Sequence, residues 1–128
     1  MILALHISLA CLKYVHSRII LAYQNGLLEE VELYELVREV LKSMPKINKP
    51  EDIYTLDKMT VVIEIEERHL IAILAVSNFG DVDENRNLVG AELMIKAKNA
   101  LLSNREEGEN SEIERLKKLW EGGDKNET

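Results

Sequence analysis

The first 24 residues of this chain constrain its fold most strongly, because residues 2–24 would be apolar around almost the whole circumference of a helix. At about 100° per residue, the side chains of His6, Lys13, Ser17 and Gln24 fall close to one narrow polar line. A helix with so little polar surface is buried on most sides. In a chain of 128 residues, this predicts a central helix or a helix at a subunit interface.

The same segment also has the period of a strand. Leu3, Leu5 and Ile7 alternate with smaller or polar side chains, and residues on one face of a strand recur at every second position. Leu and Ala favour helices and β-branched residues are few here. We therefore predict a helix, with a strand over residues 2–12 as the alternative.

This apolar run does not have the features of a secretory signal or a membrane anchor. No basic residue precedes it, and His6, Lys13 and Arg18 interrupt the roughly 20 apolar residues that a membrane span needs. The single cysteine, Cys11, has no partner for an intramolecular disulfide, which fits a reducing compartment. We expect a cytoplasmic protein that does not associate with membranes.

The composition indicates one globular domain and argues against binding to nucleic acid. Hydrophobic residues make up 46% of the chain and charged residues 30%, as is ordinary for a folded domain of modest size. The net charge of −7 has the wrong sign for a phosphate backbone, and 5% aromatic residues leave few rings to stack on bases. Abundant Glu and Lys with a single Gln lean towards a thermophilic source.

A second helix is predicted over residues 28–44. Asn25 and Gly26 can cap the preceding helix, and the acids of the second helix gather at its start while Arg38 and Lys42 lie near its end. Pro45 stops it. Two helices joined by so short a turn should lie antiparallel.

A β-hairpin is predicted to follow. Residues 59–66 alternate between apolar and polar, as in a half-buried strand, and residues 69–76 are apolar on both faces, as in a central strand. The turn at Glu67 and Arg68 lacks the Gly or Asn that tight hairpins prefer, so a helix over residues 66–76 is the alternative. Two strands alone are marginal, and we expect a third strand from a second copy of the chain rather than from residues 2–12.

The last third of the chain predicts a long helix and a docking tail. A third helix spans residues 88–104 and completes a compact α+β domain over residues 1–104, while residues 105–128 form a charged tail. Ser111 and Glu114 make a capping box for a short amphipathic helix, which is too short to be stable without docking on its own domain or on a partner. Its apolar side is formed by Ile113, Leu116, Leu119 and Trp120.

The stretch DVDENRNLVGAE has the ligand spacing of a calcium-binding loop. The sixth position of such a loop needs a left-handed backbone and normally holds Gly, whereas here it is Arg86, and a strand rather than a helix precedes it. We therefore interpret the stretch as a strand-to-helix corner with a side-chain cap, and keep a calcium site as the alternative. The ligands would be Asp81, Asp83, Asn85, Asn87 and Glu92, and the cap would be Asp83, Asn85 or Asn87.

The remaining ionisable residues predict no catalytic centre. His6, His16 and His69 lack the spacing of a metal site, and we interpret Glu64 and Glu66 as charges on an exposed strand face.

We predict a non-enzymatic protein-interaction or regulatory subunit that forms a homodimer through the first helix or the hairpin. The alternatives are a calcium-type binding module or metal-dependent enzyme that uses residues 81–92, and a small-ligand sensor with an apolar pocket between helices and sheet. The predicted interaction surface consists of Leu5, Leu9, Leu12, Leu116 and Trp120.

Overall fold

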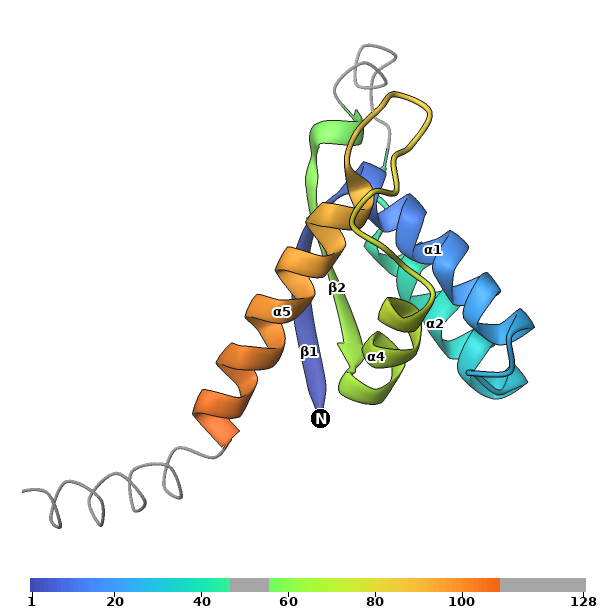
Figure 1. Ribbon diagram of the computed structural model, residues 1–128, viewed down its shortest axis with the longest axis vertical. Helices are drawn as coiled ribbons and strands as arrows, with labels where there is room; N and C mark the ends of the chain where they lie inside the picture. The colour runs from blue at the N-terminus through green and yellow to red at the C-terminus, as the bar shows by residue number, and fades with distance from the viewer. Residues whose placement is uncertain (47–55, 109–128) are drawn as a thin grey trace, which may run out of the picture.

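The computed structural model describes residues 1–46 and 56–108, and it has a mixed α+β architecture, as predicted. A two-stranded antiparallel sheet packs one face against the helices, while alternate residues of both strands leave the other face exposed; α5 lies beside β1 in Figure 1, and α1, α2 and α4 lie across the strands from it. The elements are β1 (Ile2–Ser8), α1 (Leu9–Gln24), α2 (Glu30–Ser43), the 3-10 turn η1 (Leu56–Lys58), β2 (Thr60–Glu66), α4 (Glu67–Ala75) and α5 (Val89–Gly108).

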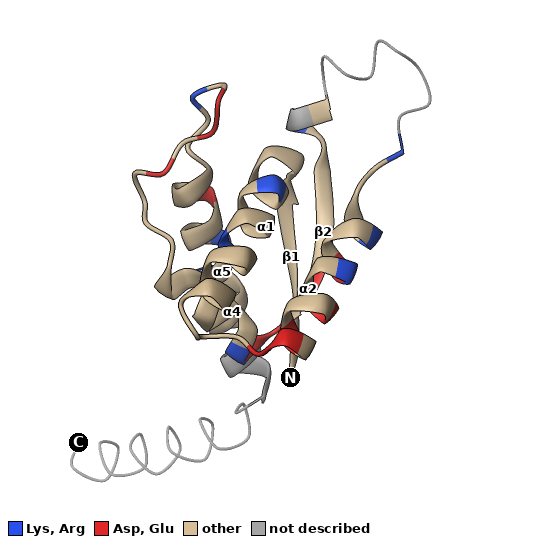
Figure 2. Ribbon diagram, turned by 90° about the vertical axis from the view of Figure 1, so that its right-hand side faces the viewer, with Lys and Arg blue, Asp and Glu red and all other residues tan. Residues whose placement is uncertain are grey.

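The first element is a strand, so the prediction of one helix over residues 2–24 is wrong for its first third. β1 pairs with β2 in the register Leu3↔Ile65, Leu5↔Ile63, and the two strands run side by side in Figure 2. The pairing joins the edges of β1 and β2, and it places Leu3, Leu5 and Ile7 in the core on the same face as Val61, Ile63 and Ile65. Burial of this stripe therefore outweighs the modest helix propensity of Leu and Ala. The expectation that a further strand comes from a second copy of the chain is wrong, because β2 pairs with β1 of the same chain.

α1 follows β1 without a connecting residue, because Ser8 ends the strand and caps the helix. The Oγ atom of Ser8 accepts a hydrogen bond of 3.1 Å from the backbone N–H of Cys11. This satisfies one of the four backbone donors that every helix leaves free at its start.

The second predicted strand is the helix α4, which follows β2 as directly as α1 follows β1. His69, Leu70 and Ile73 are buried on one side of α4, while Ile71 is exposed. A run that is apolar in nearly every position fits a buried strand as well as a buried helix. Here the backbone N–H of Glu67 donates to the carbonyl of Met1 (3.1 Å), so the chain turns over the end of β1 as α4 begins.

The hydrophobic core lies between the inner face of the sheet and the helices. α5 contacts β1, α2 contacts β2, and α1 contacts both strands as well as α2, α4 and α5. Within the described ranges, no helix is long and apolar enough to cross a membrane. The predicted short helix after Ser111 lies outside the described residues, and the division at residue 104 stays a prediction.

Candidate functional site

The acidic loop before α5 is tied to α1 through Asp81. The carboxylate of Asp81 accepts a hydrogen bond from the hydroxyl of Tyr14 and another, 3.2 Å long, from the backbone N–H of Asn78. The Tyr14 hydroxyl is the main reason that the pKa of Asp81 lies below its ordinary value. Asp81 therefore joins the loop to the first helix as an anion.

Asp83 stabilises the turn of the loop rather than the start of the helix. Its Oδ1 atom accepts from the backbone N–H groups of Asn85 (2.9 Å) and Asn87 (2.8 Å), and its Oδ2 accepts from the side-chain amide of Asn87 (2.9 Å). Partial burial raises the pKa of Asp83, but these hydrogen bonds outweigh that effect and lower it. Arg86 has a φ of 68°, the left-handed conformation that the sixth position of a calcium loop requires.

The first turn of α5 is capped by backbone carbonyls, so the expected side-chain cap is replaced. The N–H of Val89 donates to the carbonyl of Asn87 (2.9 Å), and the N–H of Gly90 donates to the carbonyl of Asp81 (3.0 Å). Two of the N–H groups at this helix end are thus satisfied by the fold of the loop itself.

Glu92, the last of the predicted calcium ligands, holds the junction of β1 and α1. Its two carboxylate oxygens accept from the backbone N–H of Ser8 (2.6 Å) and from the Ser8 hydroxyl (2.7 Å). The loop carboxylates of Asp81, Asp83 and Glu92 thus bind protein donors in three different places. Among the residues that the structure describes, no three His, Cys, Asp or Glu side chains are grouped so that they could hold a metal ion.

A cleft of about 580 Å³ lies between α1 and this loop. On the α1 side it is lined by Lys13, Tyr14, Ser17 and Arg18. The guanidinium of Arg18 lies 5.0 Å from the centre of the Tyr14 ring and donates to a backbone carbonyl at the end of α4, so it is held in place. The cleft is of a size that could take a small polar ligand.

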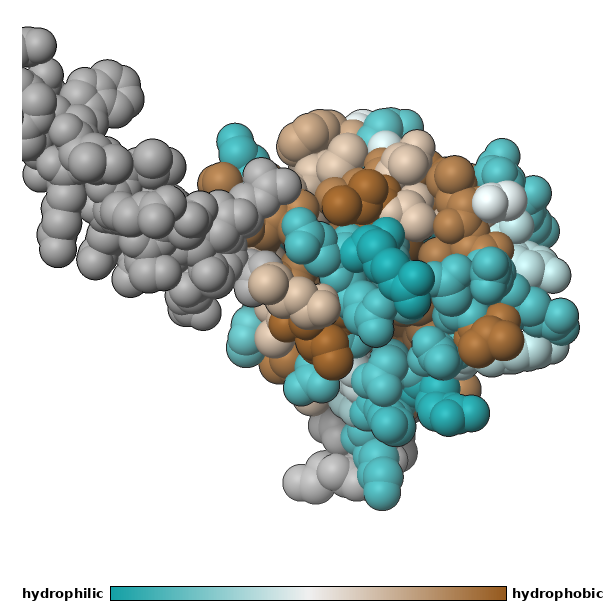
Figure 3. All heavy atoms as spheres, turned by 90° about the horizontal axis from the view of Figure 1, so that it is seen from below, coloured by the Kyte–Doolittle hydropathy of each residue, from teal (hydrophilic) through white to brown (hydrophobic). Residues whose placement is uncertain are grey.

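A cluster of charged side chains that the sequence did not reveal joins α2 to the start of α4. The Nε2 atom of the buried His69 lies 2.7 Å from the carboxylate of Glu32, whose other oxygen accepts from the backbone N–H of Glu29 (2.9 Å). Arg68 pairs with Glu66 (2.9 Å) and with Glu32 (3.6 Å). Figure 3 is a view onto the end of the molecule where β2 leads into α4, and hydrophilic side chains gather across the middle of this face.

The hydrogen bonds of this cluster favour the ionised carboxylates. The backbone N–H of Glu29, followed by His69, lowers the pKa of Glu32, and Arg68 lowers the pKa of Glu66. Glu32 and His69 are far apart in the sequence, so no local spacing links them. Only the i, i+3 spacing of Glu66 and His69 could have pointed to the cluster.

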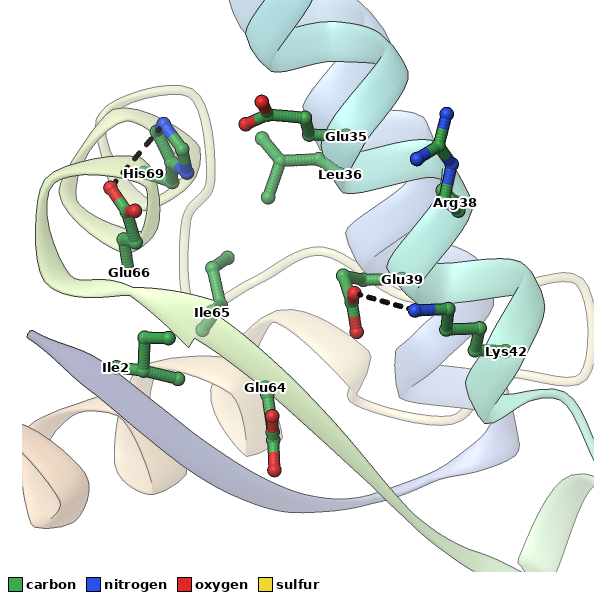
Figure 4. A pocket seen from close by; sticks show the side chains of 10 residues that line it. All are labelled: Ile2, Glu35, Leu36, Arg38, Glu39, Lys42, Glu64, Ile65, Glu66 and His69. Atoms are coloured by element: carbon green, nitrogen blue, oxygen red, sulfur yellow. Dashed lines mark hydrogen bonds and ion pairs between the residues drawn. The ribbon is translucent and has the colours of Figure 1, made fainter.

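The cluster borders a groove of about 230 Å³ between α2 and β2 (Figure 4). Leu36 points from α2 toward Ile65 of β2 and forms the apolar floor, while Glu35, Glu39 and Glu64 line the walls. A carboxylate–imidazole pair can transfer protons, but His69 is only 3% exposed and its Nε2 is held by Glu32. We interpret the pair as a bridge between two helices.

The predicted interaction residues divide into two groups. Leu5, Leu9 and Leu12 are fully buried in the chain's own core and do not reach its surface, while Leu116 and Trp120 lie outside the described residues. Exposed apolar side chains are found at other positions.

An apolar groove of about 330 Å³ lies between the end of α4 and α5. It is lined by Leu74, Phe79, Met94, Lys98, Leu101 and Leu102.

The outer side of α2 is a second apolar surface. Val31, Tyr34 and Leu41 are 65%, 61% and 64% exposed, although they are large side chains on one helix. The opposite side of α2 buries Leu36 and Val40. The outer side of a helix in a single-chain domain normally carries polar residues, and α2 departs from this pattern at Val31, Tyr34 and Leu41.

The fold and these surfaces define a small α+β domain that is held together by buried apolar side chains and by hydrogen-bonded acids at its helix starts. Comparison of the chain with protein-family models, with curated proteins and with solved structures finds no match.

Proposed function

We propose that this protein is a non-enzymatic interaction or regulatory subunit that associates with itself. The observation that supports the proposal is the exposed apolar stripe of α2, formed by Val31, Tyr34 and Leu41. Burying apolar surface contributes roughly 25 cal/mol per Å², and each of these side chains has most of its area still open to water.

The stripe replaces the interaction surface that the sequence suggested. Leu5, Leu9 and Leu12 serve the core of the single chain, so they are not available for a partner. α2, by contrast, buries Leu36 and Val40 against the rest of the chain, and the side that carries Val31, Tyr34 and Leu41 remains for a second molecule.

The mass of the protein in solution tests the proposal. The chain has a mass of 14.6 kDa, and light scattering coupled to size-exclusion chromatography should give a value that rises toward twice this mass over the micromolar concentration range. A mass of one chain at every concentration, up to the highest that stays in solution, would refute self-association.

A further inference from the structure

We infer that residues 112–120 form a helix that turns back along α5 and fills the apolar groove between α4 and α5 of the same chain. The inference concerns a contact within one molecule, so it goes beyond the proposed self-association and does not depend on it. Residues 109–128 lie outside the described residues, and their part in the inference comes from their sequence.

The groove is an apolar surface that the described residues leave open to water. Leu74 of α4 and Leu101 of α5 pack partly against the hydrophobic core, whereas Phe79 and Leu102 are 59% and 47% exposed. The residues that α5 contributes lie on one side of the helix, at i, i+4, i+7 and i+8: Met94, Lys98, Leu101 and Leu102. A second helix packed along this side would cover the apolar area that remains exposed.

The groove lies near the end of α5 that leads into the tail. Leu102 is roughly two helical turns from Gly108, where α5 ends. In Figure 1 this end of α5 lies away from the sheet and from the other helices. A segment that begins after Gly108 therefore needs only a short turn to reach the groove.

The sequence after α5 contains a segment with the matching pattern. Ser111 with Glu114 makes a capping box, which starts a helix. The apolar residues of this helix recur at i, i+3, i+6 and i+7 and share one side: Ile113, Leu116, Leu119 and Trp120. So short a helix is not stable alone in water, and it needs an apolar surface to pack against.

The connection between the two helices has the length of an antiparallel helical hairpin. Residues 109–111 make a link of three residues, within the roughly two to five that join such helices. Both helices rise by about 1.5 Å per residue, so each step along the second matches one step back along α5. If residue 112 lies beside residue 107, then residues 116–120 lie beside residues of about 99–103. Leu116 and Trp120 thus flank Leu101 and Leu102.

The short connection also favours the groove of the same chain over that of a second copy. A segment held by a short link is present at its own groove at an effective concentration of about millimolar. A second copy of the chain competes only at its concentration in solution, which in a micromolar sample is far lower.

The fluorescence of Trp120 tests the inference, because it is the only tryptophan of the chain. In the full-length native protein its emission should lie at a shorter wavelength than in urea, and acrylamide should quench it severalfold less. Leu102→Glu and Phe79→Ala change the two walls of the groove, and each should move the emission and the quenching toward the unfolded values. Both positions are exposed, so thermal unfolding by circular dichroism should show that the domain is still folded.

Two controls separate this contact from others. Leu41→Glu makes the same change at a 64% exposed position of α2 and should leave the emission of Trp120 unchanged. It alters the surface proposed for self-association, so the two proposals are tested separately. Mixing Leu102→Glu, which keeps the tryptophan, with Trp120→Phe, which keeps an intact groove, should give the sum of the two separate spectra.

The results decide which surface the tail covers. Emission that responds to both groove variants but not to Leu41→Glu, with no recovery on mixing, supports docking within the chain. Recovery of the short-wavelength emission in the mixture would place the tail in the groove of a second copy and overturn the inference. An exposed Trp120 in the wild type, or a protected one that ignores both groove variants, would overturn it too, and neither result bears on self-association through α2.

Discussion

Replacing Gly90 by Ala should destabilise this protein, although Ala is the better helix former. Gly90 lies in the first turn of α5, and a Cβ atom built on it would lie 1.9 Å from the carbonyl oxygen of Asn78 and 2.9 Å from the Cβ of Asp81. Carbon and oxygen atoms that are not bonded approach to roughly 3.3 Å. The Asn78 carbonyl would therefore have to move by more than 1 Å.

That movement disturbs the hydrogen bonds that fix the corner before α5. The Asn78 carbonyl accepts from the N–H of Asp81 (3.2 Å), and the Asp81 carbonyl accepts from the N–H of Gly90 (3.0 Å). Losing both costs about 2 kcal/mol, and residual strain adds about 1–3 kcal/mol. The gain in helix propensity offsets about 1 kcal/mol, which leaves a loss of about 2–4 kcal/mol.

Thermal unfolding followed by circular dichroism measures this effect. For a chain of this length, the loss corresponds to a fall in Tm of roughly 10 °C. Gly80→Ala is the matched control, because its Cβ would meet only the side chain of Asn78 at 3.4 Å, and its Tm should change little. A Gly90→Ala protein whose Tm equals or exceeds that of the wild type would refute the close approach of Asn78 to α5.

Three further outcomes can be measured on the same protein. Burial, with the nearby charge of Glu92, raises the pKa of the Cys11 thiol above its ordinary range, so this thiol should resist an exchange reagent until urea unfolds the chain; rapid labelling of the native protein would contradict this. Because the folded pKa of Asp81 lies below its ordinary 3.8, its stabilising effect is complete above that value and is lost as the pH falls through the folded pKa. Tyr14→Phe should therefore cost about 1–2 kcal/mol near pH 7 by urea titration and less near pH 3, and an equal cost at both would argue against the ionised hydrogen bond. Millimolar calcium should leave the Tm unchanged, because protein donors already engage the carboxylates of the acidic loop; a rise in Tm that is lost on chelation would establish the calcium alternative instead.

The elements with one clear period could be predicted from the sequence. α2 has a polar and an apolar side and strong start and stop signals, and the predicted range of 28–44 contains the observed Glu30–Ser43. β2 alternates except at Val62, and the predicted range of 59–66 differs from Thr60–Glu66 by one residue. In both, local pattern and tertiary packing favour the same structure.

The two elements that were predicted incorrectly are those in which the local pattern fits both structures. Leu3, Leu5 and Ile7 have the period of a strand within a run of helix formers, and only the need of β2 for a partner decides between them. Residues 67–75 are apolar in most positions, so neither period stands out. What decided both was contact with distant parts of the chain, which a short window of sequence does not contain.

The same limit applies to the functional surfaces. The spacing of the carboxylates in the acidic loop is visible in the sequence. That they accept hydrogen bonds from Tyr14, Asn87 and Ser8 instead of meeting at one point depends on how α1 and β1 are placed. The outer stripe of α2 could have been seen as a second apolar line at Val31, Tyr34 and Leu41. That these side chains stay exposed depends on which side of α2 packs against the core, with Leu36 and Val40.

The pairing of β1 with β2 also affects how the chain folds as it is synthesised. Ile2 pairs with Glu66 and Ser8 with Thr60, so β1 leaves the ribosome well before any residue of its partner strand. Until then, its backbone donors and acceptors and its stripe of Leu3, Leu5 and Ile7 are open to other chains, which is the condition under which strands aggregate. β1 gains its hydrogen-bonding partner only when β2 arrives. Slow translation of residues 47–66 should therefore lower the soluble yield of this protein.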